Sequence, residues 1–326
     1  MINLSDIEQA ALRLKDVSVC TPLIQNLHLD GITKGNILIK PECLQVTGSF
    51  KIRGAYNFLS QLTANEAKKG IVTWSSGNHA QGIAAAGSLL NIKTMIVMPN
   101  DAPKIKIENT RCLGGEIIGY DRCSGDREAI ANEISRKHGL KIVPSYDHRK
   151  IIAGQGTVGL ELAKDALFMG LPPDQVLIPC GGGGLSSGCS LALKSLLKNV
   201  EIFAVEPSDF DDTARSFQSG KRERVHDQVS SICDSLQTPI PGELTFDINR
   251  ELLSGVLTVT DEEVKEAIRF SFEHFKIVVE PGGAVALAAI LFGKINTKNK
   301  ITAIILSGGN IDLDLFNDIQ LSSKTD

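Results

Sequence analysis

The chain has 326 residues, and its 34 Lys and Arg against 38 Asp and Glu give a formal net charge of −4. Hydrophobic residues make up 42% and charged residues 22%, which is typical of a folded globular protein and excludes a disordered chain. A chain of this length commonly holds two domains. The acidic balance, without Lys/Arg tracts, argues against nucleic acid or a membrane surface as a partner.

The first sixteen residues alternate polar and apolar side chains at helical spacing without a continuous apolar run, so they predict a helix and not a signal peptide. No apolar stretch approaches the ~20 residues that a membrane span needs. The seven cysteines, at positions 20, 43, 112, 123, 180, 189 and 233, form no C-x-x-C pair. This odd number favours reduced thiols over a disulfide framework or a zinc site, and predicts a cytoplasmic protein.

Short apolar runs alternate with amphipathic segments along the whole chain. We expect strands at residues 37–40, 70–74, 94–98, 115–120, 140–144, 175–179, 201–206 and 302–307. Helical patterns lie between them, and this order predicts a doubly wound, largely parallel α/β fold. Residues 207–250 are the least regular stretch, and we expect them to form a long loop region that covers or shapes a site.

The sequence CGGGGLSSG, residues 180–188, places four consecutive glycines between a predicted strand and a helical pattern. Ligands of open parallel sheets bind at such positions, beyond the carboxyl ends of the strands. Free backbone N–H groups at a helix start form an anion cradle, for which a phosphate is the natural guest. No Lys-Ser/Thr follows, which argues against a nucleotide P-loop. A merely flexible turn is the alternative.

A second glycine pattern, at residues 154–159, matches G-x-G-x-x-G literally. A dinucleotide-binding fingerprint needs a strand directly before it, whereas HRKIIA precedes this one, several residues past the nearest predicted strand. We therefore interpret these glycines as points of close backbone packing inside a helix or at its start.

Three further motifs carry reactive or polar side chains. In TGSFKIRGA (47–55), Lys51 has apolar neighbours, and a desolvated lysine becomes a nucleophile for carbonyls, although a solvated lysine is the commoner case. WSSGNHAQG (74–82) brings hydroxyls and N–H groups to a helix start and suits a carboxylate, while His79 taken singly is more often structural. LSGGN (306–310) presents the Ser307 hydroxyl at the sheet edge, and a turn would explain its glycines equally well.

Together, the motifs S-F-K-I-R-G-A, S-S-G-N-H, G-G-G-G-L and S-G-G-N resemble the fold-type II pyridoxal-phosphate enzymes, specifically the threonine/serine dehydratase and serine racemase family. The resemblance runs from residues 21–24 to 307–310. It implies a tryptophan-synthase-β-like α/β fold of two domains with parallel or mixed sheets and the cofactor in the cleft. The large cofactor-binding domain would span 1–65 and 150–326, and the small asparagine-loop domain 66–149. It also implies a homodimer.

The same resemblance assigns roles by position. Lys51 would carry pyridoxal 5'-phosphate and act as general base, and Ser76 would be the second catalytic group, on the opposite face, in a racemase. The cofactor would further contact Phe50, Asn78, Gly181, Gly182, Gly183, Gly184, Leu185 and Ser307. The amino-acid substrate would contact Ser75, Ser76, Asn78, His79 and Arg127.

The acidic segment EPSDFDD, residues 206–212, resembles the segment beside which racemase-like members hold a divalent cation. It implies Mg²⁺, Mn²⁺ or Ca²⁺ bound by the carboxylates of Glu206 and Asp212 and by the backbone carbonyl of Phe210. Such an ion would be structural or activating. A solvated acidic loop is the alternative.

The reaction implied by the resemblance is elimination of water from L-threonine or L-serine, giving a 2-oxo acid and ammonia. Serine racemase is one alternative because Ser76 permits it, although SYD at 145–147 replaces the P-N-Q-type segment of mammalian racemases. A 3-hydroxyaspartate dehydratase is another, because Arg127 aligns loosely with an arginine that reaches polar substrates. Only about 16 residues follow the S-G-G-N motif, so we expect no regulatory domain and a catabolic enzyme.

Overall fold

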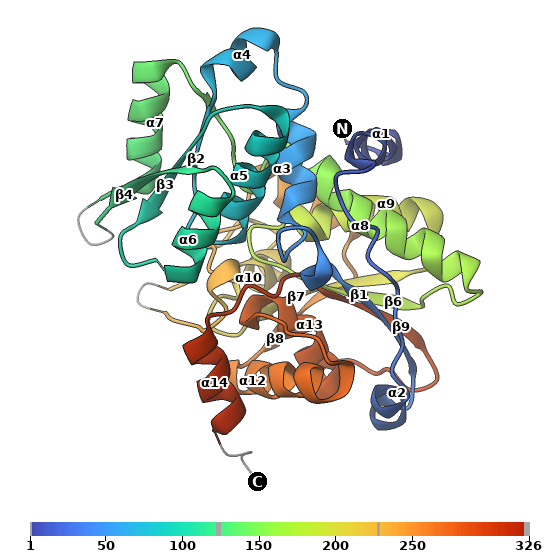
Figure 1. Cartoon of the computed structure of the whole chain (residues 1–326). Coiled ribbons are helices and arrows are strands. Elements are labelled where there is room, and N and C mark those ends of the chain that lie inside the picture. The colour runs from blue at the N-terminus through green and yellow to red at the C-terminus, as the bar shows by residue number, and fades with distance from the viewer. Residues whose placement is uncertain (1, 103, 122–124, 227–228, 323–326) are drawn as a thin grey trace.

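The computed structural model describes residues 2–102, 104–121, 125–226 and 229–322, whose strands form two separate sheets (Figure 1). The larger sheet has the order β1 (Asn36–Pro41), β9 (Ile301–Leu306), β6 (Gln175–Pro179), β7 (Glu201–Pro207), β8 (Gly255–Val259). The smaller sheet has the order β4 (Glu116–Tyr120), β3 (Thr94–Pro99), β2 (Ile71–Trp74), β5 (Lys141–Ile142). All neighbouring strands are parallel, which confirms the predicted α/β class.

Helices cover both sheets (Figure 1). In the first half of the chain they are α1 (Leu4–Leu14), α2 (Leu27–Thr33), η1 (Glu42–Leu44), α3 (Lys51–Leu59), α4 (Ala64–Lys69), α5 (Asn78–Leu90), α6 (Lys104–Cys112), α7 (Arg127–His138) and α8 (Arg149–Phe168). In the second half they are α9 (Gly184–Leu196), α10 (Asp212–Ser219), η2 (Asp234–Leu236), α11 (Glu243–Leu252), α12 (Asp261–Phe270), the π-helix η3 (Ser271–Phe275), α13 (Pro281–Leu291) and α14 (Leu313–Leu321).

Alternate residues of the central strands enter two different cores. On β6, Leu177 packs in the core that contains α12 and α13, whereas Val176 and Ile178 pack in the core that contains α8 and α9. On β9, Ile304 and Ala303 divide between the two cores in the same way. A parallel sheet with helices on both faces needs strands that are apolar on both sides, which explains the continuous apolar runs of the sequence.

The helix α3 lies between the two sheets and packs on both sides (Figure 1). Its Ile52 and Phe58 share one core with Ile83 of α5 and Ile151 of α8. This core ties the segment that begins at Lys51 to the smaller sheet. The smaller sheet occupies residues 71–142, inside the range predicted for a small domain, and the domain boundaries themselves stay a prediction.

The structure differs from the sequence predictions at one strand and one loop region, and agrees with them at one glycine pattern. The strand β8 was missed, because it lies at the sheet edge and is half-buried, so it lacks a fully apolar run. The stretch 207–250 is less irregular than expected, since α10 and α11 occupy part of it. The glycines at 154–159 do lie inside α8, where a Cβ on Gly156 would meet the Gly188 carbonyl oxygen of α9 at 2.7 Å.

Among the described residues, none of the helices combines the length and the apolar character that a membrane crossing requires. The six described cysteines are free thiols, and three of them are buried. Cys123 lies outside the described residues.

Candidate active site

The carboxyl ends of strands from both sheets border one cavity of about 540 Å³. Trp74 and Pro179 are the last residues of β2 and β6, and Ser307 directly follows β9. Every residue predicted to contact cofactor or substrate lines this cavity, namely Phe50, Lys51, Ser75, Ser76, Asn78, His79, Arg127, Gly181, Gly182, Gly183, Gly184, Leu185 and Ser307. Motifs that lie far apart in the sequence therefore meet at one site.

Lys51 is the first residue of α3, and the last strand of the larger sheet fixes its position. The Phe50 N–H donates to the Ser307 carbonyl oxygen (3.2 Å), and Ser49 forms a backbone bridge with Gly308. These contacts bring the S-F-K and S-G-G-N motifs together at the end of β9.

The Lys51 amine is desolvated. Its Nζ lies 5.0 Å from the centre of the Phe50 ring and 3.4 Å from the Ser145 carbonyl oxygen. Burial lowers the pKa of Lys51 to about 8, and the opposing attraction of Glu280 is smaller. A lysine in this environment is the kind of amine that attacks carbonyl carbons near neutral pH.

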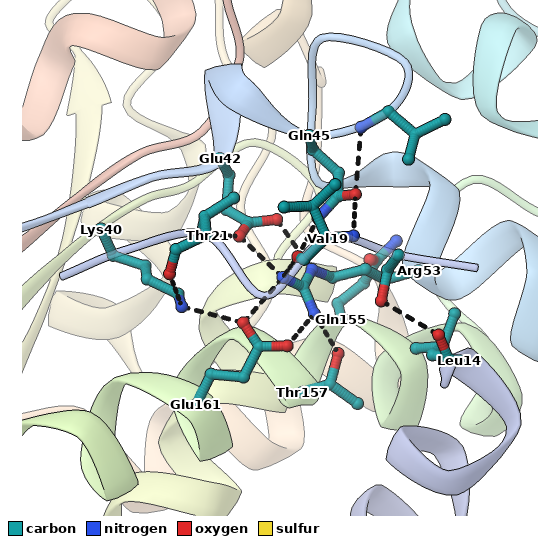
Figure 2. A network of polar contacts seen from close by, with 12 residues as sticks. Leu14, Val19, Thr21, Lys40, Glu42, Gln45, Arg53, Gln155, Thr157 and Glu161 are labelled. Carbon is teal, nitrogen blue, oxygen red and sulfur yellow. Dashed lines mark hydrogen bonds and ion pairs between the residues drawn. The ribbon is translucent and has the colours of Figure 1, made fainter. Parts of the chain in front are cut away.

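Arg53, two residues further on, anchors the start of α3 and is fully buried (Figure 2). Its guanidinium donates to both carboxylate oxygens of Glu42 (2.7 and 2.8 Å) and to both of Glu161 (2.6 and 2.9 Å). Lys40 adds a second cation, 2.8 Å from Glu161. Because Glu42 belongs to η1 and Glu161 to α8, this network holds α3, and with it Lys51, between two other elements.

The four glycines form the turn from β6 into α9. Gly183 has a φ of +87°, and a Cβ there would lie 2.9 Å from side-chain atoms of Thr245 and Asn249. A Cβ on Gly182 would lie 2.5 Å from the ring of Tyr146. The Thr245 hydroxyl also donates to the Gly182 carbonyl oxygen (2.7 Å). Both the backbone conformation and the available space therefore require glycine here.

These residues fit pyridoxal phosphate. The first N–H groups of a helix have no partner within the helix. Gly184 and Leu185, the first residues of α9, line the cavity at the glycine turn, where a phosphate can bind. Lys51 offers a desolvated amine, and the Ser307 hydroxyl lies in the same wall. Phe50 adds an apolar ring beside the lysine.

The S-S-G-N-H loop enters α5, whose first residue is Asn78. Inside the loop, the Gly77 N–H donates to the Ser75 hydroxyl (3.2 Å). His79 is buried, its Nε2 lies 3.2 Å from the Thr73 hydroxyl, and burial lowers its pKa to about 3. A neutral, buried imidazole next to β2 supports the loop, and contact of His79 with the substrate stays a prediction.

The side chain of Asn78 is held by Glu280, just before α13, and by Asn310, just after β9. Its side-chain N–H donates to the Glu280 carboxylate, and its oxygen accepts from the Asn310 amide (2.8 Å). Glu280 is buried, lines the cavity and directly precedes α13, and burial raises its pKa to about 7. The sequence analysis missed Glu280, and the only signal for it was an acidic residue before Pro-Gly-Gly at the start of an apolar helix.

Arg127 is the first residue of α7 and lines the cavity on the side of the smaller sheet. Arg222 and Arg224, from the stretch before α11, line it as well and were missed by the sequence analysis. Acidic side chains, Glu128 and Asp147 among them, border the same cavity, so its wall is not uniformly positive.

The predicted metal ligands lie away from this cavity. Glu206 is fully buried at the end of β7, where its carboxylate accepts the N–H groups of Thr213 and Ala214. Both carboxylate oxygens of Asp212 are buried without a hydrogen-bond partner among the described residues. Burial raises the pKa of Glu206 to about 8. Burial, together with the negative charge of Glu206, raises the pKa of Asp212 to about 9.

A divalent cation fits this pair, because it would compensate two buried carboxylates. The side-chain ligands are few, however. Within the described ranges, no group of three or more His, Cys, Asp or Glu side chains is arranged around a common point. The divalent cation that the sequence predicts at this segment therefore stays a proposal.

Comparison with known proteins identifies the class. Residues 15–308 match the family model described as pyridoxal-phosphate dependent enzyme. An L-threo-3-hydroxyaspartate ammonia-lyase from Pseudomonas sp. is 42% identical, covering 95% of this chain and 96% of its own. A serine racemase from Schizosaccharomyces pombe is 41% identical (95% and 95%), and an L-threonine ammonia-lyase from Thermotoga maritima is 40% identical (98% and 78%).

Solved structures agree with this assignment. Maize serine racemase superposes with a TM-score of 0.92 at 35% identity, covering 97% of this chain and 96% of its own. A serine racemase from Dictyostelium discoideum superposes with a TM-score of 0.88 at 37% identity (96% and 99%). The chain therefore belongs to the pyridoxal-phosphate dependent enzymes of fold type II, in the ammonia-lyase and racemase family.

Proposed function

We propose that this protein is an ammonia-lyase that eliminates water from a hydroxy-amino acid, L-threonine or L-serine, and releases a 2-oxo acid and ammonia. One observation carries the proposal: Lys51, the S-S-G-N-H loop, the glycine turn and Ser307 line a single cavity. The relatives named as threonine and hydroxyaspartate ammonia-lyases support the same reaction type.

When bound, pyridoxal phosphate supplies an electron sink for the electrons of the Cα–H bond. Lys51 would carry the cofactor and remove the Cα proton, a task that suits a half-buried amine whose pKa desolvation lowers to about 8. The N–H groups at the start of α9 would hold the phosphate, and Ser307 would face the ring nitrogen. The loop of Ser75, Ser76 and Asn78 would bind the substrate carboxylate.

Particular residues support one other substrate, hydroxyaspartate, and one other reaction, racemisation. Arg127 in the cavity wall favours L-threo-3-hydroxyaspartate, because a guanidinium can pair with the second carboxylate of that substrate. Ser76 also lines the cavity and would allow racemisation if its hydroxyl reaches the face of Cα opposite Lys51.

The remaining proposals concern organisation. We propose a large domain of residues 1–65 and 150–326 and a small domain of 66–149, a homodimer in the cytoplasm, and a Mg²⁺, Mn²⁺ or Ca²⁺ ion at Glu206, Phe210 and Asp212. The buried, unpartnered carboxylate of Asp212 supports the ion.

Product analysis of the purified holoenzyme tests the function. L-threonine, L-serine and L-threo-3-hydroxyaspartate are each assayed for 2-oxo acid and for the opposite enantiomer. We expect 2-oxo acid as the main product, and none of it from Lys51→Ala. An excess of D-serine over pyruvate from L-serine would contradict the lyase assignment.

Two variants separate the alternatives. If hydroxyaspartate is the preferred substrate, Arg127→Met reduces its kcat/KM and leaves that of L-threonine unchanged, because only the second carboxylate needs the guanidinium. Arg136→Met, at an exposed site of the same helix, is the matched control. If Ser76 is the second catalytic group, Ser76→Ala removes racemisation and keeps elimination.

A further inference from the structure

A buried lysine outside the cavity lining links the two walls of the site. Lys106 belongs to α6, and only 4% of its side chain is exposed, although lysines are rarely buried. Its ammonium forms an ion pair with the carboxylate of Asp234, the first residue of η2. Burial lowers the pKa of Lys106, but Asp234 and Glu280 outweigh this effect and leave the pKa raised, so the ammonium stays charged.

The two partners are attached to different sheets. On the Lys106 side, Ile107 of α6 packs in one cluster with Ala80 and Ala84 of α5 and with Ile96 of β3. The helix α6 is therefore part of the same packed unit as the S-S-G-N-H loop, from which α5 begins.

On the Asp234 side, η2 is fixed to the larger sheet. Cys233, just before η2, and Leu236, the last residue of η2, are buried in the core that contains α12 and α13. The Ser231 hydroxyl and the Ile232 N–H both donate to the carboxylate of Asp261, the first residue of α12, at 2.6 and 2.9 Å. The ion pair thus spans from one sheet to the other.

The Lys106 ammonium also lies close to the S-S-G-N-H loop. A Cβ placed on Gly77 would lie 3.9 Å from Lys106 Nζ. Gly77 and Asp234 both line the cavity. The pair is therefore positioned to hold the loop at a fixed distance from η2 and from the rest of the site.

We propose that Lys106 and Asp234 are positioning residues, which hold the S-S-G-N-H loop against η2 so that it binds the carboxylate of the amino acid. This inference rests on the proposed function, because it concerns the substrate of the same site. Both residues would act through the loop and not by contact with the cofactor or the reacting atoms. Loss of the pair weakens binding of the amino acid and leaves the chemical step and the cofactor in place.

The experiment compares Lys106→Met, Asp234→Ala and the double variant with wild-type holoenzyme. Lys106→Met keeps the length of the side chain, and Asp234 is 43% exposed, so that at least one single variant is expected to fold. Binding of L-alanine, which has no hydroxyl to eliminate, is titrated through the absorbance of the bound cofactor. KM and kcat are then measured with L-threonine.

We expect each single variant to raise the Kd for L-alanine and the KM for L-threonine about tenfold, the usual size of coupling between two sites, with little change in kcat. The double variant is no weaker than either single one, because the pair acts as a unit. Lys106→Arg restores most of the affinity. Lys104→Met, at an exposed position of the same helix, behaves as wild type.

Three results would overturn the inference: unchanged affinity in both single variants, strictly additive losses in the double variant, or a fall in kcat at constant Kd. A failure of the proposed function can be distinguished from a failure of this inference. Wild-type enzyme that binds L-alanine and forms no 2-oxo acid contradicts the proposed reaction, while the ratio of Kd values still tests the ion pair.

Discussion

At the scale of single residues, the reactivity of Lys51 is a consequence of its burial. An exposed lysine is protonated at neutral pH, whereas burial lowers the pKa of Lys51 to about 8. The free amine is the form that attacks an aldehyde. Its position at the first residue of α3, between Phe50 and the end of β9, is what removes it from water.

This gives a prediction for the protein stripped of cofactor. The rate at which it takes up pyridoxal phosphate should rise with pH and level off above about 8, because only the deprotonated Lys51 reacts. Stopped-flow absorbance across a range of pH measures this rate, with Lys51→Ala as the blank. A rate that keeps rising up to the ordinary lysine pKa of about 10.4 would contradict the prediction.

At the scale of elements, the turn from β6 into α9 is shaped by backbone requirements. Gly183 adopts a left-handed conformation, and the side chains of Thr245 and Asn249 occupy the space in which a Cβ would lie. The conformation directs the start of α9 at the cavity, and the packing of α11 behind the turn keeps it there.

Substitution of Gly183 by alanine should therefore have two effects. The left-handed conformation costs about 1–2 kcal/mol of stability in any residue with a Cβ. The clash with Thr245 also displaces the turn, so cofactor affinity falls. Gly220→Ala is a matched control, because Gly220 has a φ of +74° and open space around it.

Thermal unfolding and cofactor titration of both variants test this prediction. We expect both to be destabilised and only Gly183→Ala to release pyridoxal phosphate. Retention of wild-type cofactor affinity in Gly183→Ala would show that the turn does not hold the phosphate.

The order of strands and helices also explains which residues of the site could be predicted from the sequence. Lys51, Asn78, the glycines and Ser307 stand in local motifs at the ends of strands, so the order of elements was enough to bring them together. Glu280, Tyr146 and Asp234 reach the cavity through tertiary packing. Only Glu280 has a local signal, as an acidic residue before Pro-Gly-Gly, and that signal does not indicate the cavity. The edge strand β8 was missed for a similar reason, since half-buried strands lack a continuous apolar run.

At the scale of the whole molecule, the buried network around Arg53 links stability to pH (Figure 2). Glu42 is fully buried, and burial alone would raise the pKa of its carboxyl group. Its pairing with Arg53 has the larger effect and lowers the pKa below the ordinary 4.5. A carboxyl whose pKa is lower in the folded than in the unfolded state stabilises the fold above the unfolded value. This contribution is lost as pH falls below about 4.5.

Glu42→Gln should accordingly destabilise the protein by about 3–5 kcal/mol at neutral pH, because it leaves Arg53 buried with one carboxylate fewer. The difference from wild type should shrink as pH falls below 4.5, because the unfolded wild-type chain then takes up a proton at Glu42 that the folded protein does not. Urea unfolding at pH 7 and at pH 4 measures both values, and Glu8→Gln on the exposed face of α1 is the control. A difference that is independent of pH would contradict this account.

The central claim is that the cavity between the two sheets holds pyridoxal phosphate on Lys51. Borohydride reduction of the holoenzyme makes the lysine–cofactor linkage permanent, and peptide mass spectrometry then locates it. We predict that the modified peptide contains Lys51 and that Lys51→Ala yields no modified peptide at all. Modification of a different lysine, such as the buried Lys40 or Lys106, with Lys51 unmodified, would contradict the claim.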